Sequence, residues 1–216
     1  MKIGIGLLTY NREAYKDIFL KQLKENKPYF PYKLHIEENN PKIAAGKNNC
    51  LHALKNCEHI FLFDDDCFPI LPRWDLPFIY SGAEHLLYLN KTYKLIQQGS
   101  VYSRYADCSG CFMFLTKKAF KKVGYFNTQY PYNGMEHVGY SSRIQKAFGE
   151  NGFFSLNDTH NYIFSIDLQG AYSKYNVGHS STISVHERES AIKYNSLILQ
   201  QELNNPNLYY ENNLPN

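Results

Sequence analysis

The sequence predicts an α/β fold, a single domain in which a mainly parallel sheet is flanked by helices. Two observations support this fold class. Short apolar segments alternate with stretches of helical periodicity in the first third of the chain, an order typical of parallel sheets with helices on their faces. The 216 residues suffice for one large core, and no repeat or linker divides them. We therefore expect one domain over residues 1–203 and a C-terminal tail over residues 204–216.

Three strands and two helices are expected in the first 63 residues. Residues 2–10 form a short apolar segment with polar flanks, as in a buried parallel strand. Apolar side chains then recur at helical spacing, at Tyr15, Ile18, Phe19 and Leu23. The further expected elements are a helix from residues 11–13 to the prolines at 28 and 31, a strand at 32–37, a helix at 46–55 and a strand at 60–63.

The pattern is less regular after Pro69. We expect loops, a short helix and an edge hairpin over residues 70–108, because prolines and tyrosines interrupt any periodicity there. The later elements are a strand at 111–115, helices at 117–123 and 140–148, one or two strands within 153–168, and a helix at 187–203. The Asn- and Pro-rich end from Asn204 is expected to be frayed.

Charge and hydropathy narrow the class of partner. The formal net charge of +3 comes from scattered Lys and Arg residues, and a solvated helix face explains the lysines within 117–122. Nothing in this pattern calls for a nucleic acid as partner. No apolar run approaches the ~20 residues of a transmembrane segment, and the N-terminus does not have the pattern of a signal peptide. We expect a soluble cytoplasmic protein, or a module of a longer one.

The five cysteines are an odd number without the spacing of a disulfide framework. Cys108 and Cys111 match a CxxC pattern, but a zinc site needs a second pair and a redox motif would open a helix. Here the pair leads into the apolar run 111–115. Buried free thiols are therefore expected.

Three consecutive acids, Asp64, Asp65 and Asp66, follow the apolar run 60–63. Carboxylates cost several kcal/mol to bury unpaired, and neighbouring ones repel each other. The alternative is an acidic loop that caps a following helix. The position favours a cation site, since open α/β sheets bind ligands at the carboxyl ends of their strands and since Mg²⁺ and Mn²⁺ take oxygen ligands.

Four sequence blocks, each weak alone, occur in an order that resembles a known family. They are Gly-Leu-Leu-Thr-Tyr-Asn-Arg at 6–12, Ala-Gly-Lys-Asn-Asn-Cys-Leu at 45–51, the run into the acids at 61–66, and Val-Gly-Tyr-Phe-Asn at 123–127 followed by the Glu-His block at 134–144. This set resembles the GT-A glycosyltransferases of family 2 and their relatives, among them polypeptide N-acetylgalactosaminyltransferases and β-1,4-galactosyltransferases. The resemblance implies a nucleotide-sugar half over 1–108 and an acceptor half over 109–203.

The resemblance implies a DxD motif formed by Asp64 and Asp66, which would bind Mn²⁺ (or Mg²⁺) together with the diphosphate of a nucleotide sugar. Asp66 is the expected direct metal ligand. Asp64 is expected to meet the ribose, or the ion through water. Asp65 is the variable middle residue, and we place it among the donor-binding residues rather than the metal ligands.

Further donor contacts are expected from Thr9, Asn11 and Arg12 at the end of the first strand. Glu37 stands where the family often has an Asp that contacts the base. Lys47, in a position where Arg is commoner, begins a helix whose dipole favours anions. The alternative is that Arg12 and Lys47 are surface charges and that Glu37 is a helix-cap partner.

The resemblance also implies a general base on the acceptor side. The family commonly uses the second acid of a Glu-Asp block, but the block here reads Glu136-His137. We expect Glu136 to be the base, with His137 as the alternative because its ordinary pKa lies near ~6.5. A purely structural role for Glu136 at the start of a helix is the other possibility.

Late histidines are candidates for a further metal ligand. His179, in a Val-Gly-His segment, resembles a feature of the N-acetylgalactosaminyltransferases and ranks before His186, and His160 is a third candidate. Trp74 and Tyr132 could pack on a sugar ring, and core or loop packing accounts for them equally well.

The predicted function is a metal-dependent, inverting transfer of a sugar from a nucleoside diphosphate, with UDP expected, to a glycan or other hydroxyl acceptor. One alternative is a phosphatase of the haloacid dehalogenase type, whose nucleophile also lies in an Asp-x-Asp after a strand. That class places the motif after its first strand, and two strands precede it here. The other alternative is a carbohydrate- or nucleotide-sugar-binding relative without turnover. The sequence contains no code for the sugar or the acceptor.

Overall fold

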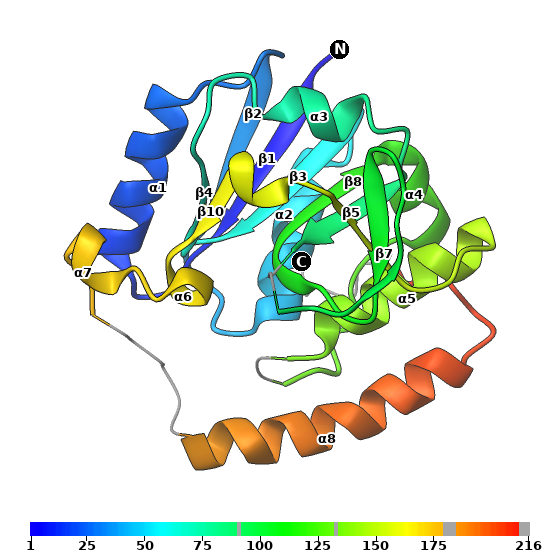
Figure 1. Ribbon diagram of the computed structural model, residues 1–216. Helices are drawn as coiled ribbons and strands as arrows, with labels where there is room; N and C mark the ends of the chain where they lie inside the picture. The colour runs from blue at the N-terminus through cyan, green and yellow to red at the C-terminus, as the bar shows by residue number, and fades with distance from the viewer. Residues whose placement is uncertain (90–91, 132–133, 179–184, 212–216) are drawn as a thin grey trace.

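The computed structural model describes residues 1–89, 92–131, 134–178 and 185–211, with only the backbone described at 185, 186 and 188. Its centre is a five-stranded sheet in the order β2-β1-β3-β8-β5 (Figure 1). β1 is parallel to β2 and β3, whereas β8 runs antiparallel to β3 and β5. The strands are β1 (Ile3–Leu8), β2 (Tyr32–Glu37), β3 (His59–Asp64), β8 (Ser109–Thr116) and β5 (His85–Tyr88). The expected mixed, mainly parallel α/β sheet is confirmed.

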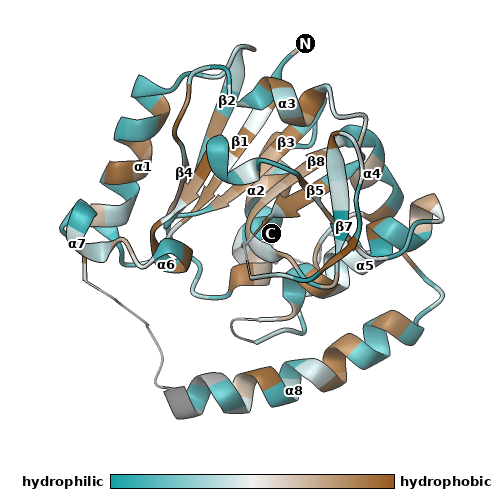
Figure 2. Ribbon diagram, viewed as in Figure 1, coloured by the Kyte–Doolittle hydropathy of each residue, from teal (hydrophilic) through white to brown (hydrophobic). Residues whose placement is uncertain are grey.

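Helices cover both faces of this sheet. α1 (Glu13–Glu25) and the short α3 (Asp75–Ile79) pack on one face, and α2 (Ile43–Leu54), α4 (Lys117–Val123) and α5 (Glu136–Phe148) pack on the other. Apolar residues are concentrated on the central strands, with polar residues on the outer helix faces (Figure 2). Burial of these strands from two sides explains their nearly continuous apolar sequences.

Two smaller sheets and several short helices accompany the central sheet. β4 (Cys67–Pro69) pairs antiparallel with β10 (Ile163–Ser165). β7 (Tyr102–Tyr105) lies between β6 (Leu95–Gln97) and β9 (Phe153–Leu156) in a second small sheet. The remaining short elements are the 3-10 turn Thr159–Asn161, α6 (Ile166–Gln169) and α7 (Tyr172–Tyr175). β10 and α6 therefore bring residues 163–169 beside the segment that follows β3.

α8 (Val185–Asn204) is a long helix that lies along the outside of the molecule and packs against α5 (Figure 1). Its buried side chains form one stripe: Ala191, Asn195, Ile198 and Glu202. None of the helices formed by the described residues combines the length and apolar character required to cross a bilayer.

The C-terminal segment 205–211 was expected to be frayed, and this prediction is wrong. Tyr210 forms a short parallel bridge with Gly124, and its backbone N–H donates to Val123 O at 3.0 Å. Arg143 donates to Leu208 O and lies 4.2 Å from the Tyr210 ring centroid. The segment is held because buried Arg143 finds partners in it.

The segment after β3 agrees in part with the expectation. Residues 67–69, for which no strand was expected, form β4. Residues 70–108, expected to contain loops, a short helix and an edge hairpin, form α3, the buried edge strand β5 and the antiparallel pair β6 and β7. Trp74 is fully buried against Phe61 and Phe63, so the core interpretation of this residue is correct and a sugar contact is excluded. Tyr132 lies outside the described residues.

The cysteines agree with the prediction of free thiols. Cys50, Cys57, Cys67 and Cys108 are buried, and Cys111 is partly exposed. Burial raises the pKa of the Cys50 thiol to about 12. This thiol is therefore protonated at neutral pH and behaves as a small core residue.

Candidate active site

A cleft with a cavity volume of ≈ 320 Å³ opens at the carboxyl ends of β1 and β3 and the amino end of β8. The sheet changes there from parallel to antiparallel strands, and α5 and α6 close the cleft from the opposite side. Its acidic lining residues are Asp64, Asp65, Asp66, Glu136 and Asp167. The other lining residues include Thr9, Tyr10, Arg12, Ser109, Gly110, Cys111, Gly134 and His137.

Lys47 lies between the two sides of the cleft, close to Asp64 on one side and to Glu136 on the other. Its ammonium group lies 3.4 Å from Asp64 Oδ1 and 3.6 Å from Glu136 Oε1, and it donates to Gly110 O at 3.0 Å. Lys47 is 1% exposed. Burial alone would lower the pKa of Lys47, but Asp64 and Glu136 together raise it above its ordinary value. The surface-charge interpretation of Lys47 is therefore wrong, because the side chain is a buried cation between two carboxylates.

Asp65 is fixed by residues that follow β1. Leu8 and Asp64 are paired across β1 and β3, so the residues after them lie side by side. Thr9 Oγ1 donates to Asp65 Oδ2 at 2.7 Å, and Arg12 donates to Asp65 Oδ1 at 2.7 Å. Both residues line the cleft. Their contact with a donor stays a prediction, and their hydrogen bonds in this structure hold Asp65.

Asp66 lies against a segment that the sequence analysis did not single out. Ser165 Oγ donates to Asp66 Oδ2 at 2.5 Å, and Ile166 N donates to the backbone oxygen of Asp66. Asp167 adds a carboxylate to the cleft and lies 3.8 Å from Arg12. The sequence indicates a helix start at Ser165, whose hydroxyl caps α6. No spacing connects it with Asp66, because the two meet only through the pairing of β4 with β10.

Glu136 begins α5 after two residues with left-handed backbone. Gly134 has φ 101° and Met135 has φ 71°, and such strain in a non-glycine residue concentrates at functional sites. Gly134 N donates to Glu136 Oε2 at 3.0 Å, and His137 Nδ1 lies 3.6 Å from Glu136 Oε1. Burial would raise the pKa of Glu136, but His137 and Lys47 lower it to about 2. Glu136 is therefore ionised at neutral pH.

The three consecutive carboxyls at 64–66 differ from Glu136, because the pKa of each is raised. Burial raises the pKa of Asp64 to about 7 against the opposing charge of Lys47. Burial likewise raises the pKa of Asp65 to about 6, although Arg12 opposes the shift. The pKa of Asp66 is also raised, again chiefly by burial. The ionised forms of these groups are destabilised, as expected where nearby acids outnumber the bases.

The donor set fits a divalent cation. Asp64 Oδ1 is buried, lies 3.4 Å from the Lys47 ammonium and accepts no hydrogen bond, and an added cation would be a further partner for this oxygen. Within the described part of the chain, no three or more His, Cys, Asp or Glu side chains already surround a common point. Mg²⁺-type ions often take only one or two protein carboxylates and complete their shell with water and substrate phosphate. Asp64 and Asp66 are the residues that would hold such an ion.

Some predicted site residues lie elsewhere. Glu37 is buried and accepts hydrogen bonds from Asn39 N and Asn49 Nδ2, and it is not among the cleft-lining residues. Asn11 has a left-handed backbone with φ 55° and is exposed beside the cleft. Their donor contacts stay predictions. His179 lies outside the described residues, as does the side chain of His186.

Comparison with curated proteins finds one viral relative. The chain is 29% identical over 146 residues to an uncharacterized glycosyltransferase, R363, of Acanthamoeba polyphaga mimivirus, with 61% of this chain and 57% of the relative covered. No protein-family model matches the chain.

Solved structures give a wider comparison. The chain matches GalNAc-T7, solved with UDP, GalNAc and Mn²⁺, at a TM-score of 0.56 and 8% identity, over 72% of this chain and 42% of that one. It matches a mannosyltransferase from Pyrobaculum calidifontis, solved with GDP-Man and Mn²⁺, at a TM-score of 0.52 and 12% identity, over 73% and 55% of the two chains. The chain has the GT-A fold.

The GT-A fold confirms the resemblance found in the sequence. It also argues against the haloacid dehalogenase alternative, because the acids here follow the third strand, β3, and the segment after β1 carries Thr9 and Arg12. The chain spans about half the length of these three relatives, between 42% and 57%. The activity and substrates of those relatives are therefore not assigned to this chain by the comparison.

Proposed function

We propose that this protein is a metal-dependent glycosyltransferase that uses a nucleotide sugar, with UDP as the nucleotide. The observation that carries the proposal is the arrangement of two sets of acids across one cleft, Asp64 to Asp66 at the end of β3 and Glu136 at the start of α5. The name of the viral relative and the GT-A fold support the same reaction class. Solved relatives hold UDP or GDP-Man with Mn²⁺.

Asp64 and Asp66 would hold Mn²⁺ or Mg²⁺ in this proposal. The ion would stabilise the charge that develops on the diphosphate as the sugar leaves. Asp64 is suited to this role because its buried Oδ1 accepts no hydrogen bond. Asp66 is oriented by Ser165, which donates to one of its carboxylate oxygens. Asp167 extends the acidic surface to the other rim of the cleft.

Glu136 would accept the proton of the acceptor hydroxyl during a direct, inverting displacement. Its low pKa ensures the ionised form at neutral pH, although a weak base gains less from Brønsted catalysis. Its position is well defined, because Gly134 N holds one oxygen while Lys47 and His137 lie near the other. His137 lines the cleft beside Glu136 and is the alternative proton acceptor.

The test is transfer or hydrolysis of UDP-sugars, assayed with Mn²⁺ and with a chelator. Asp66→Ala should reduce kcat/KM at least ~100-fold, because it removes a metal ligand. Glu136→Gln should reduce kcat by roughly 100-fold or more with little change in donor affinity. Asp17→Asn, at an exposed position on α1, is the matched control. Full activity in the chelator, or in Asp66→Ala, would contradict the proposal.

A binding protein without turnover is the second candidate, and the weak basicity of Glu136 favours it. Binding of UDP-sugar and Mn²⁺ can be followed by thermal unfolding, since a ligand at 100 times its Kd stabilises the folded state by about 2.7 kcal/mol. Metal-dependent stabilisation that requires Asp66, combined with no turnover of any UDP- or GDP-sugar, would identify this alternative.

A further inference from the structure

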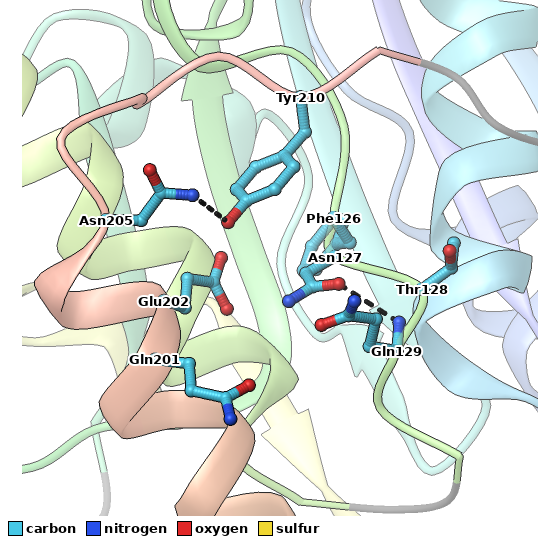
Figure 3. A pocket seen from close by; sticks show the side chains of 8 residues that line it. All are labelled: Phe126, Asn127, Thr128, Gln129, Gln201, Glu202, Asn205 and Tyr210. Atoms are coloured by element: carbon cyan, nitrogen blue, oxygen red, sulfur yellow. Dashed lines mark hydrogen bonds between the residues drawn. The ribbon is translucent and has the colours of Figure 1, made fainter.

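A second cavity lies away from the acidic cleft, between α8 and the loop that follows α4. Its volume is ≈ 290 Å³, at the small end of ligand sites. Side chains of Asn127 and Gln129 from the loop and of Gln201 and Asn205 from α8 and its extension point toward the same space (Figure 3). Tyr210 of the C-terminal segment closes the cavity on one side (Figure 3).

The lining is rich in groups that both donate and accept hydrogen bonds. Asn127 Oδ1 accepts from Gln129 N at 3.0 Å, and this bond orients the amide of Asn127. Asn205 Nδ2 donates to the Tyr210 hydroxyl at 3.4 Å. Gln129 and Gln201 are exposed at the rim. Primary amides offer two donors and an acceptor each, which is the complement of a hydroxyl group.

The cavity carries no uncompensated charge among its described lining residues. Glu202 is the one carboxylate there, and it is 3% exposed. Its Oε1 lies 2.7 Å from Arg143 Nε, and its Oε2 accepts from the Tyr130 hydroxyl at 2.7 Å. A cation would compete with Arg143 for this carboxylate, and an anion would meet it unfavourably. The lining therefore favours a neutral polar ligand.

We propose that this cavity is a second ligand site, which binds a neutral, hydroxyl-rich molecule of the size of one saccharide unit. The size of the cavity, the amide and phenol groups around it and the internal neutralisation of Glu202 are the three observations that lead to it. The binding proposal stands independently of the proposed transferase activity.

Both walls of the cavity are also connected with Glu136. Asn48, next to Lys47 on α2, holds the loop by two hydrogen bonds to the backbone of Phe126, at 3.0 and 2.7 Å. On the other wall, Asn195 of α8 donates to Gly134 O at 2.8 Å, and Gly134 N donates to Glu136. The hydrogen bonds therefore connect the cavity walls with the start of α5.

The experiment is an NMR titration of the protein with methyl glycosides of glucose, galactose, mannose and N-acetylglucosamine. We expect saturable shifts of the 126–129 and 201–210 amides with at least one of them, at Kd values on the order of 1 mM. Methyl glucuronoside, which carries a carboxylate, should bind more weakly than methyl glucoside. Saturable shifts in neither segment with any neutral glycoside would overturn the proposal.

Matched variants locate the site. Gln129→Ala combined with Gln201→Ala should weaken binding on the order of tenfold, because two hydrogen-bonding amides are lost. Gln200→Ala, at the adjacent exposed position of α8, should leave it unchanged. Asp66→Ala should also leave it unchanged, whatever its effect on turnover. Unchanged affinity in the double variant, or loss of binding in Asp66→Ala, would assign the glycoside to another site and overturn the proposal.

Discussion

The protein contains two groups of charged side chains, one around the cleft and one buried around Arg143, that differ in how completely their charges are paired. In the first, around the cleft, five acidic side chains face Arg12 and Lys47, and Asp64 Oδ1 accepts no hydrogen bond. In the second, Arg143 bonds Glu202 and the backbone oxygens of Val123, Tyr125 and Leu208. Each oxygen of Glu202 also has a partner.

This difference in pairing distinguishes a candidate ligand site, the cleft, from a structural element, the Arg143–Glu202 group. Buried charges that are fully paired need no ligand, and their role is to fix neighbouring segments, here α5, α8 and the C-terminal segment. In the cleft, acidic side chains outnumber basic ones, and their mutual repulsion destabilises the folded state unless a cation binds. The raised pKa values of Asp64 and Asp65 are consistent with burial and with this repulsion. Both groups include a residue of α5, which carries Glu136 at its start and Arg143 further along.

The largest expected effect on stability comes from removing Arg143 from its ion pair with Glu202. Arg143→Met should lower the free energy of unfolding by about 3–5 kcal/mol, because Glu202 is left buried without its cation. Urea denaturation followed by circular dichroism measures it. Arg104→Met, on β7, where the guanidinium bonds an exposed backbone oxygen, is the control and should cost less than ~1 kcal/mol.

A double variant sharpens the same result. Arg143→Met combined with Glu202→Leu should recover much of the lost stability, since apolar side chains can replace a buried ion pair. A loss in Arg143→Met no larger than in Arg104→Met would show that the pair does not hold α8 and the C-terminal segment.

A smaller effect on stability is expected when the pH is lowered, because the buried neutral side chain of His85, which contacts Ser141 of α5, becomes protonated. His85 Nδ1 donates to Phe114 O at 2.7 Å, and in the neutral ring Nε2 accepts from Ser141 Oγ at 2.8 Å. Burial lowers the pKa of His85 to about 4. Because the folded-state pKa lies below the ordinary 6.5, its contribution is fully present above pH 6.5. It is lost as pH falls towards 4, by on the order of 3 kcal/mol at most.

The measurement compares unfolding free energies at pH 7 and pH 4.5 in the native protein and in His85→Gln. The variant should lose less stability over this interval, because its amide does not titrate. His52→Gln, at an exposed position of α2, is a comparison that should keep the native pH dependence. Identical pH profiles in all three proteins would contradict the assignment to His85.

Local patterns predicted much of the fold and the first part of the site. β1, β2, β3 and α1 follow from apolar runs and helical spacing, and the acids at 64–66 stand out because they interrupt such a run. Asp64 to Asp66, Thr9, Arg12 and Glu136 line one cleft, and their roles in it stay predictions. The burial of Lys47 between Asp64 and Glu136 was not expected.

The remainder depends on contacts between residues far apart in sequence. Asp167 reaches the cleft because β10 pairs with β4, and two three-residue strands leave no periodicity to recognise. Glu202 meets Arg143 across 59 positions, so neither residue looks different from a surface charge in the sequence. An edge hairpin was expected within 70–108, but the position of β5 was not, since its four residues gain their strand character from pairing with β8.

The most direct comparison of the two kinds of buried charge uses one substitution at two positions. Asp64→Asn removes a charge from the incomplete group while keeping the shape of the side chain. Because burial and the neighbouring acids destabilise ionised Asp64, the variant should be more stable than the native protein by roughly 1–2 kcal/mol without metal. Added Mn²⁺ should then stabilise it less than it stabilises the native protein.

Asp75 provides the matched control, as a fully buried carboxylate whose oxygens accept from Tyr29 N at 2.7 Å and Phe30 N at 3.1 Å. Asp75→Asn should therefore destabilise the protein by about 1.5–3 kcal/mol, because charge-assisted hydrogen bonds are lost. Thermal unfolding of both variants measures the two changes in stability, which should be opposite in sign. If Asp64→Asn were as destabilising as Asp75→Asn, the carboxylate of Asp64 would already be satisfied by Lys47, and the cleft would have no unmet need for a cation.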